Sequence, residues 1–396
     1  MKNLSLLSLL LVLFPFSIVP AQENKPPQSL SETFINRPSD KKLSLGMYGH
    51  VDYTQPLDDS LRKNGKLDVT RLVMLMNYKF SDKLDFFSEV EFEHVKELWV
   101  EQAFLQYRFN DALMLRGGLM VIPMGIVNEY HEPTTYNGVK RPSIDTRIVP
   151  TTWREIGFGL SGNLSQAYLK YQIYLVNGFK SYDGTANLGG PNGFRSGRQR
   201  GAESFISSPN LSAKVDFYGI SGLNIGLAGY FGNTQSTLYQ DLQKDDKALN
   251  DRADSTVVNL AMMGLDARYT LGGLQLRGQY IINMVGNTAA YNAFSGKDLG
   301  SRMGGWYAEA AWNLLHGSEA AGRPLTLFAR IEQYDLHAAT ENGLARNKAY
   351  NMTEITTGLG YSIAEGAVIK ADVQLISDKS ESAFHPTINA GIGFNF

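Results

Sequence analysis

The chain has 396 residues, of which 43% are hydrophobic and 19% charged, and its net charge is −2 at neutral pH. A net charge this close to zero provides no field of one sign, which excludes general recruitment of nucleic acid. The absence of cysteine excludes disulfide scaffolds and cysteine-based metal sites or nucleophiles.

Residues 1–21 are typical of a secretory signal peptide. Lys2 precedes an apolar run, and small or apolar residues at positions 19 and 21 predict cleavage after Ala21. An anchoring helix is the alternative, but the run is short for a membrane span and the stretch contains two prolines. We therefore expect an exported protein. Residues 22–41 are polar and contain prolines, which predicts a flexible periplasmic leader.

From Leu43 onward the sequence has a period of two. In residues 98–109, for example, Ala103, Leu105 and Tyr107 alternate with polar side chains. Such a period sends successive side chains to opposite faces of a sheet, and each segment has about the 9–11 residues of a tilted transmembrane strand. The sixteen predicted strands are residues 42–53, 66–80, 83–94, 98–109, 112–123, 153–163, 166–177, 210–218, 222–232, 256–271, 273–284, 302–315, 323–335, 352–363, 366–377 and 385–396.

The connections between these segments alternate between very short and mostly longer ones. This alternation predicts an all-β fold: a transmembrane antiparallel β-barrel of about sixteen strands over residues 42–396, with short periplasmic turns and long extracellular loops. A secreted propeller or sandwich is the alternative. It gives no reason for aromatic residues to gather at one end of the apolar face, as is predicted for Tyr78, Phe80, Tyr107, Phe109, Phe217, Tyr269, Trp312, Tyr361, Phe394 and Phe396.

The polar face of the predicted barrel carries basic and acidic residues in equal numbers. Because unpaired buried charge is costly, this face should line a hydrated lumen, and the balance predicts a weakly selective pore. The residues selected as pore wall are Arg71, Arg108, Arg116, Arg154, Glu155, Glu89, Glu91 and Glu93.

The connection between the fifth and sixth predicted strands, residues 124–152, is the candidate constriction; we call it the third loop. Its position favours a loop folded into the lumen, although an ordinary surface loop could have the same composition. Its charged residues are Glu129, Glu132, Lys140, Arg141, Asp145 and Arg147, with Arg116, Arg154 and Glu155 as expected wall partners. A basic cluster in a later loop, Arg195, Arg198 and Arg200, either attracts anions at the mouth or belongs to a mobile surface loop.

Several stretches resemble a known family. Residues 115–125 (LRGGLMVIPMG) resemble the strand-to-loop motif of the phosphate-selective porin O/P family, residues 152–162 (TWREIGFGLSG) its next strand, and residues 176–179 (VNGF) its seventh. The C-terminal GIGFNF resembles the assembly signal of outer-membrane barrels, which ends in an aromatic residue. The resemblance implies a sixteen-stranded, trimeric porin of the bacterial outer membrane with an inward-folded third loop. Its partners would be membrane lipid and the barrel assembly machinery.

We therefore expect a porin for passive diffusion of small hydrophilic solutes or ions, with anions such as phosphate among the candidates. The phosphate-selective members carry dense lysine and arginine clusters at the constriction, whereas the third loop here is balanced in sign. A structural or adhesive barrel without significant conductance is the alternative. An enzyme is not expected, because none of the six histidines lies in a recognisable catalytic motif, and no cofactor or metal is expected either.

Overall fold

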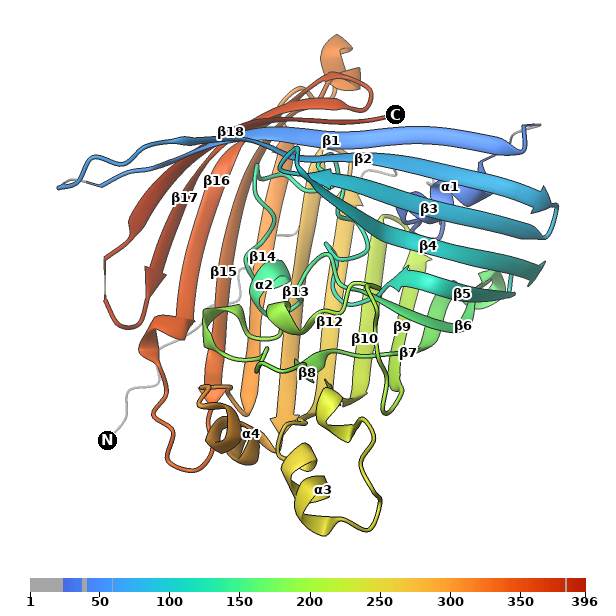
Figure 1. Ribbon diagram of the computed structural model, residues 1–396. Helices are drawn as coiled ribbons and strands as arrows, with labels where there is room; N and C mark the ends of the chain where they lie inside the picture. Colours follow the sequence, from blue (N-terminus) through green and yellow to red (C-terminus); the bar gives the residue numbers. More distant parts are fainter. Residues whose placement is uncertain (1–23, 38–40, 59, 382) are drawn as a thin grey trace, which may run out of the picture.

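Sixteen of the strands close into one barrel, in which every strand pairs antiparallel with its neighbours and β1 pairs with β18 (Figure 1). The structure is a computed structural model that describes residues 24–396 except 38–40, 59 and 382, so the predicted signal peptide lies outside the described residues. None of the helices among the described residues is both long and apolar enough to cross a membrane.

All sixteen predicted strands are confirmed, with ends that differ by a few residues. The barrel strands are β1 (Leu43–Pro56), β2 (Lys66–Ser81), β3 (Leu84–Glu93), β4 (Glu97–Asn110), β5 (Leu113–Val121), β6 (Arg154–Leu164), β7 (Leu169–Val176), β9 (Asn210–Ile220), β10 (Leu223–Asn233), β12 (Asn259–Leu271), β13 (Leu274–Gly286), β14 (Arg302–Asn313), β15 (Leu325–Ala339), β16 (Asn351–Ala364), β17 (Ala367–Asp378) and β18 (His385–Asn395). The loops add a small parallel sheet of β8 (Lys180–Tyr182) and β11 (Gln235–Ser236), and the helices α1 (Leu30–Asn36), α2 (Ile144–Arg147), α3 (Lys247–Asp254) and α4 (Thr288–Ser295).

The period of two separates an apolar outer face from a polar inner one. In β6, the side chains of Ile156, Phe158 and Leu160 are exposed on the outside, whereas Glu155 is buried inside the barrel. An apolar outer band suits contact with lipid. Six of the predicted aromatic residues are exposed near the ends of their strands: Phe80, Tyr107, Phe109, Trp312, Tyr361 and Phe396.

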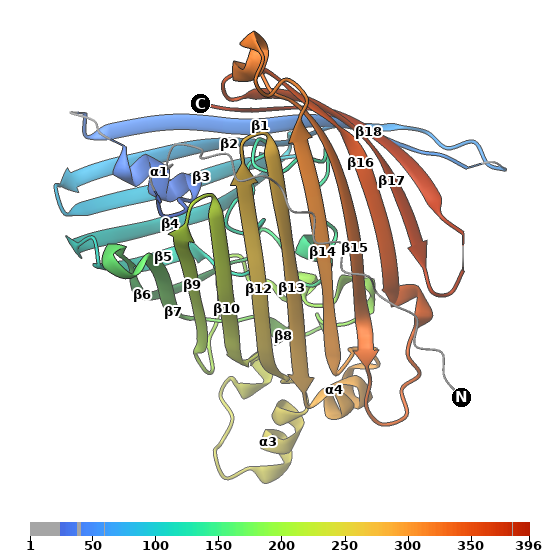
Figure 2. The same ribbon diagram turned by 180° about the vertical axis from the view of Figure 1, so that it is seen from behind.

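Short turns lie at one end of the barrel and most of the long loops at the other, as predicted. Figures 1 and 2 show α3 and α4, which belong to long loops, at the end opposite the C-terminus. There are two exceptions. The β3–β4 connection, on the long-loop side, is only residues 94–96, and the β14–β15 connection, on the short-turn side, is residues 314–324.

The N-terminal leader differs from the sequence-based prediction, because part of it is a buried helix rather than a flexible segment. Ser29 and Glu32 form a capping box that begins α1, in which each residue's side chain bonds the other's backbone N–H. Phe34 is buried against the barrel, and a Cβ atom on Gly46 would lie 2.2 Å from the Phe34 ring. Gly46 therefore provides the space in which the helix docks, and helix α1 lies inside the barrel wall.

Candidate functional site: a charged cavity beside the third loop

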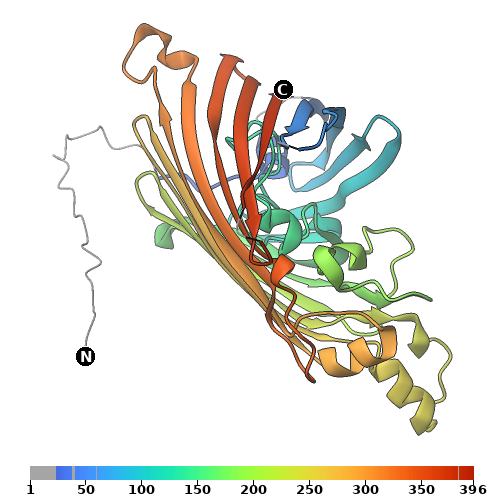
Figure 3. The ribbon, with the colours of Figure 1, turned by 90° about the vertical axis from the view of Figure 1, so that its left-hand side faces the viewer.

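The third loop folds into the barrel interior, where Figure 3 shows its chain between the walls. Its side chains Ile126, Val127, Ile144 and Ile148 are buried in one apolar cluster. The amide of Asn128 joins the two ends of the loop: its nitrogen donates to the carbonyl of Ile122 (2.7 Å), and its oxygen accepts from the backbone N–H of Trp153 (2.8 Å). The loop is therefore closed at its base before it reaches the far wall.

Glu129 anchors the first part of the loop to the wall. Its carboxylate lies 2.6 Å from the ammonium group of Lys214 on β9 and accepts a 2.6 Å hydrogen bond from Gln172 on β7. Burial by itself raises the pKa of Glu129, but the positive charges of Lys214 and Lys170 and the hydrogen bonds from Lys214 and Gln172 together outweigh it and lower the pKa. Glu129 is therefore ionised at neutral pH and forms a buried ion pair.

His131 anchors the loop to β3 and β4. Its Nε2 atom lies 3.1 Å from Glu89 and 3.5 Å from Glu101. Burial alone lowers the pKa of His131, but the two carboxylates outweigh it and raise the pKa to about 10. These three residues could together hold a metal ion, since their ligand atoms lie within 4.8 Å of one another. The positive charges of protonated His131 and of Arg71, which lies 2.6 Å from Glu101, already balance the two carboxylates.

The tip of the loop rests on β17. Lys370 donates to the carbonyl oxygens of Pro133, Tyr136 and Gly138. Next to it, Asp372 accepts a 2.6 Å hydrogen bond from the backbone N–H of Val139. A cation bound by three carbonyls holds the backbone of the tip rather than its side chains.

The returning part of the loop contacts the wall through charged and polar side chains. Lys140 lies 2.7 Å from Asp52 on β1, and Gln279 on β13 donates to Asp145 (2.8 Å). Burial raises the pKa of Asp145 to about 7, an effect that the Gln279 hydrogen bond only partly offsets. The Oδ2 atom of Asp145 has no hydrogen-bond partner among the described residues, in agreement with a carboxyl that is easily protonated.

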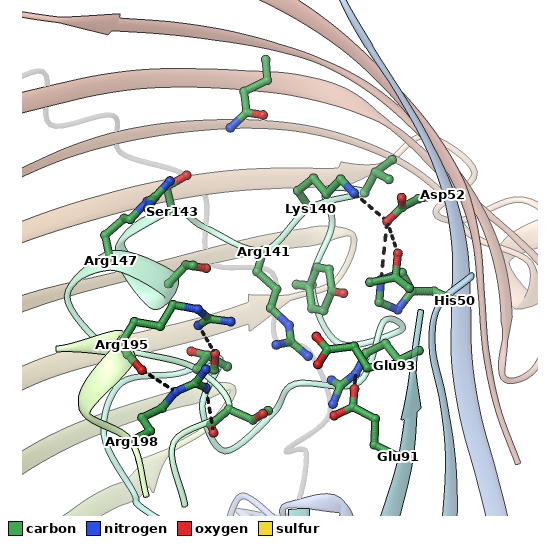
Figure 4. Close-up of a pocket in the computed structure, with 18 of the residues that line it drawn as sticks. His50, Asp52, Glu91, Glu93, Lys140, Arg141, Ser143, Arg147, Arg195 and Arg198 are labelled. Atoms are coloured by element: carbon green, nitrogen blue, oxygen red, sulfur yellow. Dashed lines mark hydrogen bonds and ion pairs between the residues drawn. The ribbon is translucent and has the colours of Figure 1, made fainter. Parts of the chain in front are cut away.

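A cavity of about 420 Å³ lies between the returning loop and the wall. Figure 4 shows Arg147, Arg195 and Arg198 on one side of it, and His50, Asp52, Glu91 and Glu93 on the other. The basic lining residues are Arg71, Lys140, Arg141, Arg147, Arg154, Arg195, Arg198 and Arg200; the acidic ones are Asp52, Glu91, Glu93 and Glu354. Basic residues therefore outnumber acidic ones here, which the balanced composition of the third loop does not reveal.

Among the lining arginines, Arg71 and Arg154 are paired with carboxylates, whereas five have no carboxylate partner within the part of the chain that the structure describes: Arg141, Arg147, Arg195, Arg198 and Arg200. Arg198 donates to the carbonyl oxygens of Pro150 (3.0 Å) and Thr152 (3.1 Å), and Arg195 donates to that of Thr151. Burial, together with the positive charges of Arg141 and Arg200, lowers the pKa of Arg195 to about 10. The bonds of Arg195 and Arg198 to backbone carbonyls leave their positive charge without an opposite charge beside it.

The structure places the sequence-selected residues in three groups. Residues at the cavity are Arg71, Glu91, Glu93, Lys140, Arg141, Arg147, Arg154, Arg195, Arg198 and Arg200. Glu89, Glu129 and Asp145 hold the loop, and Glu132 is buried with one oxygen unpaired. Arg108, Arg116 and Glu155 lie elsewhere.

The expected wall partners of the loop are therefore wrong in two of three cases. Arg116 reaches Glu32 of helix α1 (3.3 Å) instead of the third loop. Glu155 accepts a hydrogen bond from its near neighbour Trp153 (2.9 Å) and from Tyr230. Arg154 lines the cavity, but its ion pair is with Glu101 of the wall (3.8 Å). The loop crosses the lumen, so most of its partners lie on distant strands.

Glu101 is the functional residue that the sequence reasoning missed. Glu101 is an even number of residues from Ala103 and Leu105, so the period of two predicts that it lies with them on the outer face. The register between β3 and β4 shifts between Glu89 and Val90, and both Glu101 and Gln102 are buried. A β-bulge of this kind lets two successive residues point inward. The signal in the sequence was a charged residue, Glu101, at a position where the period of two otherwise places apolar residues.

The chain is similar to known proteins in sequence and in fold. No family model matches the chain. An uncharacterized protein of Aquifex aeolicus (strain VF5) is 30% identical over 341 residues, which is 84% of this chain and 75% of that protein. The fold is similar to that of an anion-selective porin from Comamonas acidovorans, with a TM-score of 0.55, 12% identity, and coverage of 89% of this chain and 100% of that one. It is equally similar to a Salmonella typhi OmpF complex with daunomycin: TM-score 0.55, 13% identity, 89% and 97% coverage. The fold is that of a bacterial outer-membrane barrel.

Proposed function

This chain belongs to the same family as the uncharacterized Aquifex aeolicus protein, and from its barrel and basic cavity we propose that it is an outer-membrane porin for small hydrophilic anions. Solutes would cross by passive diffusion through the lumen, without a chemical reaction. The resemblance of residues 115–125 and 152–162 to the phosphate-selective porin O/P family supports the same class of solute. It also supports a homotrimer as the assembly in the membrane.

The observation that carries this proposal is the pair Arg195 and Arg198. Both lie in the lumen cavity and donate only to backbone carbonyls, so their charges act on whatever enters. Positive side chains in a narrow space with low-dielectric walls concentrate anions and repel cations. Guanidinium groups also match the geometry of small oxyanions such as phosphate, because they donate two parallel hydrogen bonds.

Reversal potentials in planar bilayers under a potassium chloride gradient test the proposal. We expect the wild-type channel to prefer chloride. The double variant Arg195→Gln/Arg198→Gln should shift the reversal potential toward cations, since it removes two unpaired charges from the cavity. Lys247→Gln is the matched control, because Lys247 is exposed on α3 outside the barrel and its loss should leave the reversal potential unchanged.

Three outcomes would contradict the proposal. A channel that prefers potassium would show that the acidic side of the cavity determines selectivity. Equal reversal potentials for the wild type and the double variant would place the selective region elsewhere. A folded barrel that conducts no ions would favour the structural or adhesive alternative.

A further inference from the structure

Two layers of the chain itself cross the first half of the lumen, along β3 to β12. The third loop forms the first layer. Glu129 pairs with Lys214, and the guanidinium carbon of Arg268 lies 4.1 Å from the centre of the Tyr130 ring. Together with the contacts of His131, these interactions cover strands β3 to β12.

Helix α1 forms the second layer, on the side of the short turns. Glu32 lies 2.6 Å from Lys170 on β7 and 3.3 Å from Arg116 on β5. Phe34 packs against Phe87 on β3, at a ring distance of 6.5 Å. The helix therefore contacts the same part of the wall as the first part of the third loop.

The second half, along β13 to β18, holds the tip of the third loop together with its returning part, in which Asp145 accepts from Gln279 on β13 and Ser143 donates to Glu354 on β16. A pocket of about 290 Å³ lies on one side of the tip, lined by Tyr136, Asn137, Arg277 and Lys370 among others. The basic cavity of about 420 Å³ lies on the other side. Both spaces lie against strand β17, because its residue Lys370 lines the pocket and its residue Gln374 lines the cavity.

Tyr136 is the aromatic side chain that lines both spaces. It is 3% exposed, and its ring lies 4.4 Å from the ammonium group of Lys370. The backbone around it is fixed by Lys370 and by Arg277, which donates to the carbonyl of Thr135 (2.8 Å). Tyr136 is therefore the residue common to the two linings, on a stretch of backbone that Lys370 and Arg277 hold in place.

We propose that solutes cross the lumen along the β13–β18 half, and that the side chain of Tyr136 sets the narrowest point of this route. The proposal rests on the porin function proposed above. A solute that leaves the basic cavity would pass the ring and meet Lys370 and Arg277 next. The route therefore remains basic on both sides of its narrowest point, as an anion path requires.

Single-channel recordings of three variants test this route. Tyr136→Ala should raise the conductance about twofold or more and let larger solutes pass in liposome swelling assays, because it removes the ring that lines both cavities. Tyr136→Phe should behave like the wild type, since the ring is retained. Tyr130→Ala is the matched control: it removes a ring of the same size from the first half, and the conductance should not change. Electrophoresis of unheated samples establishes that each barrel is folded.

The outcomes separate the route from the function. If the single-channel conductance of Tyr136→Ala equals that of the wild type, the proposed route is wrong, but the porin function is not contradicted. A larger current in Tyr130→Ala than in Tyr136→Ala would place the passage in the other half and also overturn it. If folded wild-type protein and all variants carry no current, the porin function itself is refuted, and the route with it.

Discussion

Asp145 is a residue at which the pH dependence of stability can be predicted. Burial raises its pKa to about 7, against an ordinary value of 3.8, with Glu332 acting in the same direction and Arg330 and Arg141 against it. A carboxyl whose folded-state pKa is raised contributes its full stability below the unfolded-state value. That contribution is lost as pH rises toward 7, by about 1.4 kcal/mol per pH unit.

Asp145→Asn keeps the shape of the neutral carboxyl but cannot ionise. We therefore expect this variant to be more stable than the wild type at pH 8 and about as stable at pH 4, in urea unfolding of the detergent-solubilised protein. Glu129→Gln should have the opposite effect at pH 8, because burial opposes its charge but Lys214 stabilises it. Equal destabilisation of Asp145→Asn at both pH values would mean that the folded state needs the ionised carboxylate.

Single residues also mark where prediction from sequence ends. The period of two assigns most strand side chains to the correct face. Glu101 is an exception, because a register shift turns two successive residues inward. Loop residues have no such period. That Glu129 contacts Lys214 on β9 and that Val139 contacts Asp372 on β17 depends on how the third loop crosses the lumen, which no local pattern encodes.

At the scale of elements, helix α1 gives a prediction that thiol labelling can check. Glu32→Gln removes the negative partner of Lys170 and Arg116, and breaking a buried ion pair costs about 3–5 kcal/mol. The helix should then leave the wall for part of the time. A cysteine at Ser31, which is 4% exposed, should react slowly with a polar thiol reagent in the otherwise wild-type chain and faster in the Glu32→Gln background.

A cysteine at the exposed position Thr33 should react rapidly in both backgrounds and serves as the control. Because the chain has no cysteine of its own, each label reports on one site. Slow labelling at Ser31 in the Glu32→Gln variant would show that Phe34 and its apolar contacts hold the helix without the ion pair. The Ser-x-x-Glu spacing of Ser29 and Glu32 was the signal for this helix in the sequence. Its docking site, opened by Gly46, was not visible there.

For the whole molecule, the fold was predictable and the site was not. The period of two and the alternating connections identify sixteen strands, because each strand obeys the same local rule. The basic cavity combines residues from separate parts of the chain: Arg71 and Arg154 on strands, Arg141 in the third loop, and Arg195 and Arg198 after β7. A count of lumen charges gives a balance of signs. In the described structure, however, Arg141, Arg195 and Arg198 have no carboxylate partner, whereas Arg71 and Arg154 do.

The closed ladder of strands predicts that the barrel does not need the third loop in order to fold. We expect replacement of residues 129–148 by a short Gly-Ser link to leave the sixteen-strand barrel intact, since Asn128 still joins the base of the loop and no ladder hydrogen bond is lost. The ion pairs of the loop offset its ordering entropy, roughly 1–2 kcal/mol per residue, so water can replace them at a modest net cost.

Single-channel conductance should rise in this variant, and anion preference should fall but persist. Lys140, Arg141 and Arg147 are lost, whereas Arg195 and Arg198 keep their carbonyl partners at Pro150 to Thr152. Circular dichroism and electrophoresis of unheated samples check the fold, and planar bilayers the current. If the barrel no longer folds, the third loop is required for folding. A folded barrel with unchanged conductance would place the narrowest point at helix α1 or at the basic segment around Arg198, which are also packed inside the wall.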